Sequence, residues 1–164
     1  MLMMITTILG NIYHDAKWQS PARTVDYVDL EWHELNKRLL RKKSRSQQEV
    51  GIQLSSNQAL LSEGDVLFSD ATTLLVINVL PCECIAVETH DQHEMASICY
   101  EIGNRHAPLF FHPTKENILL LAMDKPLMLM LEKMGCHVHV ANAKLIYPLG
   151  GAAKRHAHTH SHDE

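Results

Sequence analysis

The chain has 164 residues, of which 46% are hydrophobic and 21% charged, and its formal net charge is −4 with neutral histidines. These values are typical of a folded globular protein with one ordinary domain or two small ones, and the negative charge argues against a dedicated nucleic-acid binder. The apolar N-terminal run stops at Gly10, too soon for a signal peptide or a membrane span. We therefore predict a cytoplasmic protein, whose four cysteines lack paired spacing and stay reduced.

The first third of the chain predicts short strands joined by turns. Alternating apolar and polar residues, β-branched residues and turn-forming clusters indicate this structure. The segment 34–41 has helical propensity, but we prefer a hairpin between its basic end and the strand that follows. The predicted strands cover residues 3–9, 25–30, 38–43, 49–54, 66–68 and 74–79.

From Cys82 onward, strand-like and helix-like periods alternate. The predicted strands are 84–89, 109–112, 118–121 and 137–140, and the predicted helices are 91–104, capped by Asp91, and 124–135, capped by Asp124 and stopped by Gly135. The second helix should bury Leu127, Met130, Leu131 and Met134. This order, βαββαβ, predicts an α+β chain with a ferredoxin-like domain whose two helices cover one face of the sheet. We place an all-β domain at 1–79, the ferredoxin-like domain at 80–147 and a histidine-rich tail at 148–164.

The segment 94–106 predicts a short amphipathic helix followed by an arginine and a histidine. One apolar stripe is formed at i, i+3, i+4 and i+7 by Met95, Ile98, Cys99 and Ile102. We expect Gly103 and Asn104 to take a left-handed conformation and end the helix. The helix would then pack through its stripe and project His106, which by itself is more typical of a surface residue than of a metal ligand.

The C-terminal tail carries histidines at alternate positions: His156, His158, His160 and His162. An extended chain turns alternate side chains to one side, so these imidazoles can converge on one ion. Neutral imidazole suits Ni(II), Zn(II) and Cu(II) alike, so the ligand type does not choose the metal. A protein with a metal-binding tail is expected to have other metal ligands as well, so the tail makes a metal-binding role of His106 a better interpretation than the residue alone suggests.

His106 alone cannot hold a divalent transition metal, which takes four to six donors. A two-fold dimer that juxtaposes two helix ends would supply two copies of His106, and the tails could complete the shell. Such an exposed site suits a carrier that hands its ion on. Arg105 is expected to contact a carboxylate or the backbone, because guanidinium stays protonated.

Several segments of the chain together resemble the urease accessory protein E family, the nickel chaperones of urease maturation. They are the run from Tyr100 to His106 with its Gly-Asn-Arg-His end, the histidine-rich C-terminus, and the segments 32–43 and 63–67. The resemblance implies Ni(II) as the bound metal and no catalytic role. It also implies a homodimer, which a shared metal could extend to a tetramer, and delivery to the urease maturation GTPase and the apo-urease accessory complex, with the N-terminal domain contacting partners.

Other readings of these residues stay open. Metal storage by the tail alone is the alternative function, and a metal-dependent hydrolase is disfavoured because no His-Glu-x-x-His run is present. His137 with His139 is a weaker candidate metal pair, whereas Cys82 with Cys84 and His90 with His93 are interpreted as core and surface residues. The basic cluster, Lys37, Arg38, Arg41, Lys42, Lys43 and Arg45, is either a solvated hairpin or a docking surface for an acidic partner.

Overall fold

The computed structural model describes residues 1–19 and 22–149, which form two compact units. The first contains Met1–Glu83 and Asn142–Ile146, and the second contains Cys84–Ala141 and the described residues from Tyr147 onward. The chain is a mixed α+β protein with more strand than helix. Within the described part of the chain, no helix is long and apolar enough to cross a membrane.

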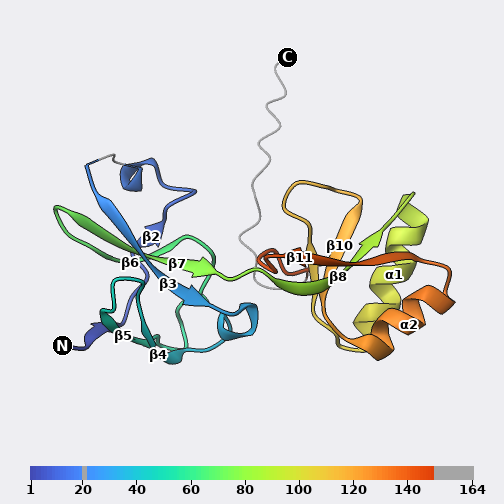
Figure 1. Cartoon of the computed structure of the whole chain (residues 1–164), viewed down its shortest axis with the longest axis horizontal. Helices are drawn as coiled ribbons and strands as arrows, with labels where there is room; N and C mark the ends of the chain where they lie inside the picture. Colours follow the sequence, from blue (N-terminus) through green and yellow to red (C-terminus); the bar gives the residue numbers. More distant parts are fainter. Residues whose placement is uncertain (20–21, 150–164) are drawn as a thin grey trace, which may run out of the picture. The chain divides into compact units, whose positions relative to one another are not determined.

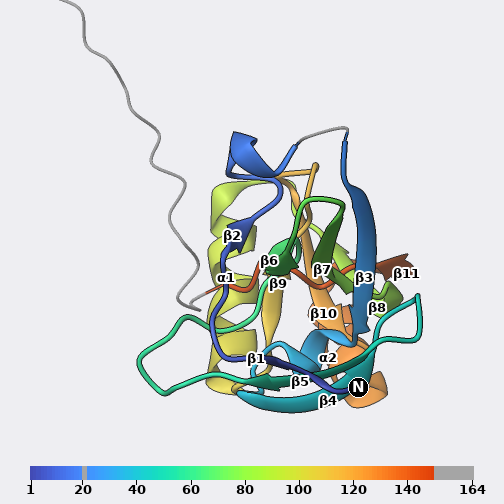
Figure 2. The same cartoon turned by 90° about the vertical axis from the view of Figure 1, so that its left-hand side faces the viewer.

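The first unit consists of two sheets with a shared core. Its strands are β1 (Met3–Ile5), β2 (Gly10–Asn11), β3 (Thr24–Leu30), β4 (Leu39–Lys43), β5 (Glu49–Gln53), β6 (Asp65–Ser69) and β7 (Thr73–Val79), with 3₁₀ turns η1 (Ala16–Trp18) and η2 (Trp32–Glu34). The strand orders are β1-β5-β4 and β2-β6-β7-β3. Figure 2 shows the small sheet as a layer beneath the larger one, and buried residues of both sheets, such as Ile52 and Ile77, belong to one apolar cluster.

The predicted hairpin of the first unit is confirmed, because β4 pairs antiparallel with β5. The predicted strand at 3–9 is wrong in extent: β1 ends at Ile5, and the chain then turns to form the two-residue β2, which pairs with β6. The remaining strands of this unit lie where the alternation predicted them, within two residues at each end.

The second unit has the predicted order of elements (Figure 1). These are β8 (Cys82–Glu88), α1 (Gln92–Asn104), β9 (Leu109–Phe111), β10 (Ile118–Ala122), α2 (Lys125–Lys133) and β11 (His137–Ala143), with strand order β11-β8-β10-β9. Alternate residues of β8 and β10, among them Val87 and Leu119, form one buried cluster with Ile98 of α1 and Leu131 of α2. Both helices therefore pack on the same face of this sheet.

The predicted caps position both helices. The side chain of Asp91 accepts a hydrogen bond from the Glu94 N–H at 2.8 Å, and that of Asp124 accepts from the Leu127 N–H at 2.9 Å. Each carboxylate thus satisfies one of the free N–H groups of a first helical turn. The apolar stripe of α1 is confirmed, but Met134 lies outside the core with 42% of its surface exposed, because α2 ends at Lys133.

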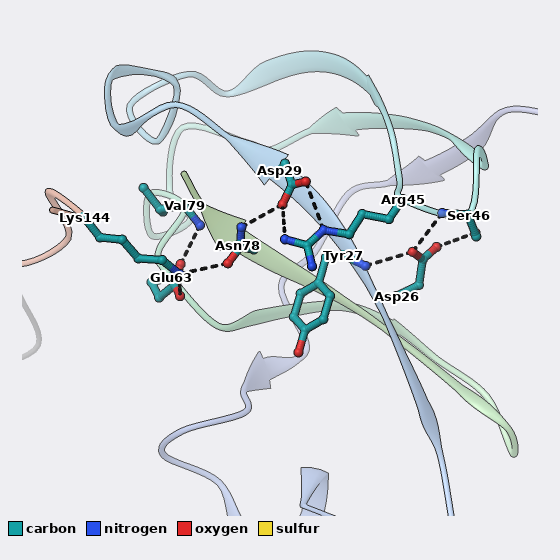
Figure 3. Close-up of polar contacts among 9 residues, drawn as sticks. All are labelled: Asp26, Tyr27, Asp29, Arg45, Ser46, Glu63, Asn78, Val79 and Lys144. Atoms are coloured by element: carbon teal, nitrogen blue, oxygen red, sulfur yellow. Dashed lines mark hydrogen bonds and ion pairs between the residues drawn. The ribbon is translucent and has the colours of Figure 1, made fainter. Parts of the chain in front are cut away.

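A chain of polar contacts joins the returning segment to the first unit (Figure 3). Lys144 Nζ donates to Glu63 Oε1 at 2.7 Å and to Asn78 Oδ1 at 2.8 Å, and Asn78 Nδ2 donates to Asp29 Oδ1 at 2.7 Å. Arg45 donates to both oxygens of Asp29. Although this segment follows β11 in sequence, these contacts attach it to the first unit, as does Ile146, which packs against the core of that unit.

Candidate metal-binding site at the end of helix α1

His106 lies directly after the C-terminal end of α1 and is exposed. Its backbone is left-handed, with φ of 54°. The His106 N–H donates to the Gly103 carbonyl at 3.0 Å, and the Ala107 N–H donates to the Ile102 carbonyl at 3.4 Å. These two bonds define a Schellman motif, in which the left-handed position is His106 and the apolar residue after it contacts the core beside Ile102.

The second helix of the same unit ends in the same motif. Its left-handed position is Gly135, with φ of 83°; the Gly135 N–H donates to Glu132 O at 2.9 Å, and the Cys136 N–H donates to Leu131 O at 3.0 Å. Glycine is the usual residue at this position because it carries no Cβ. The two helix ends therefore share one hydrogen-bond pattern, with the preferred residue at α2 and a histidine at α1.

The predicted left-handed stop at Gly103 and Asn104 is wrong. Both residues belong to the helix, which continues to Asn104 and is capped by Arg105. A left-handed Gly103 would place the polar Asn104 at the position that packs against the core, whereas a left-handed His106 places Ala107 there. Packing of the following residue thus overrides the local preference for glycine.

Arg105 contacts the helix, as predicted. Its Nη1 donates to the Glu101 carbonyl at 3.1 Å and to Glu101 Oε2 at 3.0 Å. The guanidinium therefore binds free carbonyl and carboxylate oxygens at the negative end of the helix dipole. His106 therefore remains the candidate metal ligand at this helix end.

The described residues do not by themselves complete a metal site around His106. Within residues 1–19 and 22–149, no group of three or more His, Cys, Asp or Glu side chains is arranged to hold a metal ion. The predicted tail ligands, His156, His158, His160 and His162, lie outside the described residues. Any site at His106 must take its other donors from the tail or from a second copy of the chain.

Neither Cys82 nor Cys84 belongs to a group of three potential metal ligands among the described residues. Cys84 is buried, and its Sγ donates to the Ala141 carbonyl at 3.5 Å. Burial, followed by the charge of Glu31, raises the pKa of the Cys82 thiol above 9.0. Because the thiolate is the metal ligand, this environment disfavours coordination. The interpretation of these residues as core and edge cysteines is consistent with their placement.

Most of the basic cluster is engaged within the first unit. Lys37 and Lys42 pair with Glu34, Arg41 with Glu49 and Arg45 with Asp29, and Arg38 donates to the carbonyls of Ser55 and Gln58. Three carboxylates therefore balance the charge of only half of the six basic residues in this cluster.

The structure brings together two histidines that the sequence analysis treated separately. His137 is exposed at the start of β11, and its ring centroid lies 6.4 Å from that of His90, which precedes α1. The interpretation of His90 as a surface residue is confirmed, because its side chain is 73% exposed, but its proximity to His137 was not predicted. The two histidines are close because β8 and β11 are neighbours in the sheet, and the periodicity of the sequence does not specify which strands are neighbours.

Comparison with known proteins covers nearly the whole chain. Residues 5–80 match the UreE urease accessory protein N-terminal domain, and residues 82–164 match the C-terminal domain of the same family. The urease accessory protein UreE of Acetivibrio thermocellus is 44% identical over 84% of this chain and 88% of its own length. The proteins of that name from Flavobacterium johnsoniae and Helicobacter pylori are 32% and 40% identical over 97% and 87% of this chain, and over 93% and 82% of their own lengths. This chain belongs to the UreE family of urease accessory proteins.

Proposed function

We propose that the protein is a nickel metallochaperone that binds Ni(II) through His106 from each subunit of a homodimer, with the C-terminal histidines as further ligands. It is not an enzyme; it works in the cytoplasm and delivers the ion through the urease maturation GTPase to the apo-urease accessory complex. Family membership supports the role in urease maturation. The observation that carries the proposal is the exposed His106 at a left-handed position that favours glycine.

The backbone strain at His106 is the reason why the proposal rests on this residue. A non-glycine residue in the left-handed region costs about 1–3 kcal/mol and is typical of functional sites. The imidazole forms no hydrogen bond or ion pair within the described residues that would offset this cost. Metal binding supplies a reason for a histidine here, since a neutral imidazole is a good ligand for Ni(II).

A homodimer is supported by apolar surface on the second unit. Tyr100 of α1 is 68% exposed, Phe111 at the end of β9 is 42% exposed and Tyr147 is 43% exposed. The Phe111 N–H donates to the Tyr147 carbonyl, so these two residues share one edge of the sheet, and β9 follows His106 closely in the chain. Exposed aromatic residues of this kind are enriched in protein interfaces. Tetramers would form where two dimers share one metal.

The first unit is proposed to contact the partners of urease maturation. A groove of ≈ 320 Å³ on the β1-β5-β4 sheet is lined mainly by apolar side chains and by the backbone of Gly51. A Cβ at Gly51 would lie 2.7 Å from Met4 Sδ, so the flexible Met4 side chain would have to move to accommodate it. For domain boundaries we keep 1–79, 80–147 and 148–164 and the ferredoxin-like class of the second domain, which the strand order supports.

The experiment is a calorimetric Ni(II) titration of the native protein and His106→Ala, with light scattering to count subunits. We expect one tight site per dimer in the native protein and its loss in His106→Ala. A second variant that ends after Gly151 should keep this site and lose weaker ones. If instead the truncated variant loses all binding while His106→Ala keeps it, the protein stores metal through its tail alone.

A further inference from the structure

We propose a second metal site on the C-terminal unit, formed by the imidazoles of His90 and His137 and specific for a divalent transition metal. It goes beyond the proposed function because neither His106 nor the tail takes part. His90 lies in the turn between β8 and α1, and His137 is the first residue of β11. The antiparallel arrangement of β8 and β11 brings these two ends of the sheet together.

Each histidine is held by a carboxylate through the same ring nitrogen. His90 Nδ1 lies 3.0 Å from Glu94 Oε2, and His137 Nδ1 lies 2.8 Å from Glu88 Oε2. A proton on Nδ1 that is donated to a carboxylate leaves Nε2 with a free lone pair. Metal-binding histidines are typically oriented in this way by a carboxylate outside the coordination shell.

The Glu94 carboxylate is itself fixed. It accepts the His90 backbone N–H at 2.7 Å, while its own N–H donates to Asp91 at the start of α1. His90 is thus oriented by a group that is part of a helix cap.

The two rings are close enough to share a metal ion after small side-chain rotations. Their centroids are 6.4 Å apart, with an angle of 37° between the ring planes. With a metal–nitrogen distance of about 2.1 Å, two imidazoles on one ion have centroids roughly 5–6 Å apart. The side chains of His90 and His137 are 73% and 64% exposed, so little packing opposes a small rotation about their χ angles.

The surroundings leave room for the remaining ligands. The side chains of both histidines are mostly exposed, so solvent reaches each ring. Water molecules can fill the open coordination positions, and nearby carboxylates favour a cation. Two imidazoles with several waters make a weak, quickly exchanging site, in contrast to a closed structural site. No third protein ligand converges here among the described residues.

The test uses the full-length chain in which His106, His156, His158, His160 and His162 are replaced by alanine, here called the background variant. Because this variant lacks every ligand of the proposed chaperone site, its behaviour is independent of that proposal. We expect one Ni(II) per chain by calorimetry, and an electron paramagnetic resonance spectrum of bound Cu(II) with two nitrogen donors. Copper is the probe because it binds nitrogen sites most tightly in this series.

Variants of single residues in this background identify the ligands. His90→Ala or His137→Ala should weaken Ni(II) binding at least tenfold and remove one nitrogen donor from the Cu(II) spectrum. Glu88→Gln should weaken binding about 10–100-fold while both nitrogen donors stay. His33→Ala is the matched control, an exposed histidine of the first unit that should change nothing. The proposal is overturned if the background variant binds no Ni(II), or if neither histidine variant differs from the control.

Discussion

We predict that His106→Gly makes the metal-free protein more stable but abolishes its tight nickel site. In His106→Gly the left-handed backbone at φ of 54° is kept without a Cβ, and the hydrogen bonds of the Schellman motif stay in place. The left-handed conformation costs a non-glycine residue about 1–2 kcal/mol. Glycine loses roughly 0.5–1 kcal/mol more backbone entropy on folding, which offsets part of the gain. We therefore expect the metal-free variant to be more stable by about 0.5–1 kcal/mol.

The assay compares metal-free proteins by urea unfolding and the same proteins by Ni(II) titration. A gain of 1 kcal/mol raises the melting temperature of a protein of this size by about 2–4 °C. His106→Ala retains a Cβ in the left-handed backbone, so its stability should stay within about 0.5 kcal/mol of the native protein. Both variants should lose the tight nickel site equally.

Gly135→Ala provides the reciprocal control at the matched end of α2. A Cβ there would meet no atom within 4 Å, so the change adds backbone strain at φ of 83° and no collision. It should lower stability by about 1 kcal/mol and leave nickel binding unchanged. If His106→Gly is no more stable than His106→Ala, the strain argument is refuted. If either variant keeps the tight site, His106 is not its ligand.

Three further predictions concern other positions. Gly103→Ala should stabilise the protein by about 0.5–1 kcal/mol in urea unfolding, because Gly103 is helical and the added Cβ would meet no atom within 4 Å. A loss of stability would instead indicate that Gly103 has a left-handed backbone. Lys144→Met should lower the free energy of unfolding by about 1–2 kcal/mol, since it removes the partner of the nearly buried Glu63. Lys43→Met is the control and should have little effect. Equal effects of the two substitutions would show that the ion pair between Lys144 and Glu63 contributes nothing to stability. The hydrogen bonds from Arg45 hold the pKa of Asp29 in the folded protein below its ordinary value of 3.8. The charged Asp29 therefore stabilises the folded state fully above pH 3.8. This stabilisation is lost as the pH falls from 3.8 through the pKa of Asp29 in the folded protein. In Arg45→Ala, the urea concentration at the midpoint of unfolding should therefore decrease less steeply with falling pH below 3.8 than in the native protein. Arg41→Ala, which removes an exposed ion pair with Glu49, is the control. A decrease as steep in Arg45→Ala as in Arg41→Ala would contradict the assignment of the pKa shift to Arg45.

Local signals in the sequence were sufficient for most elements of the second unit. Asp91 and Asp124 each stand three residues before the N–H group that they accept, and Gly135 stands where a left-handed residue is required. These rules involve atoms a few residues apart, so they can be read from the sequence. The stripe of α1 was predictable for the same reason, because residues at i, i+3, i+4 and i+7 share one face of a helix.

Contacts between distant residues were not predictable in this way. His90 and His137 are 47 positions apart and meet only because β8 and β11 are neighbours in the sheet. Likewise, Lys144 follows the second unit in sequence but bonds to Glu63 and Asn78 of the first. The alternation of residues gives the face of a strand but not its neighbour, so neither juxtaposition follows from periodicity.

The failure at the end of α1 has a different cause, and it bears on function. Local rules placed the left-handed residue at Gly103, but the chain packs Ala107 against the core and thereby moves that conformation to His106. Two backbone hydrogen bonds and this apolar contact fix the backbone at His106, so only its side-chain torsions stay free. A ligand held in this way reaches solvent from a rigid base, which limits the entropy lost on binding. A cost near 1 kcal/mol is tolerable against a typical stability of about 5–15 kcal/mol. The packing of Ala107 explains the left-handed backbone at position 106 but not the choice of histidine over glycine there, and functional constraint is expected at such positions.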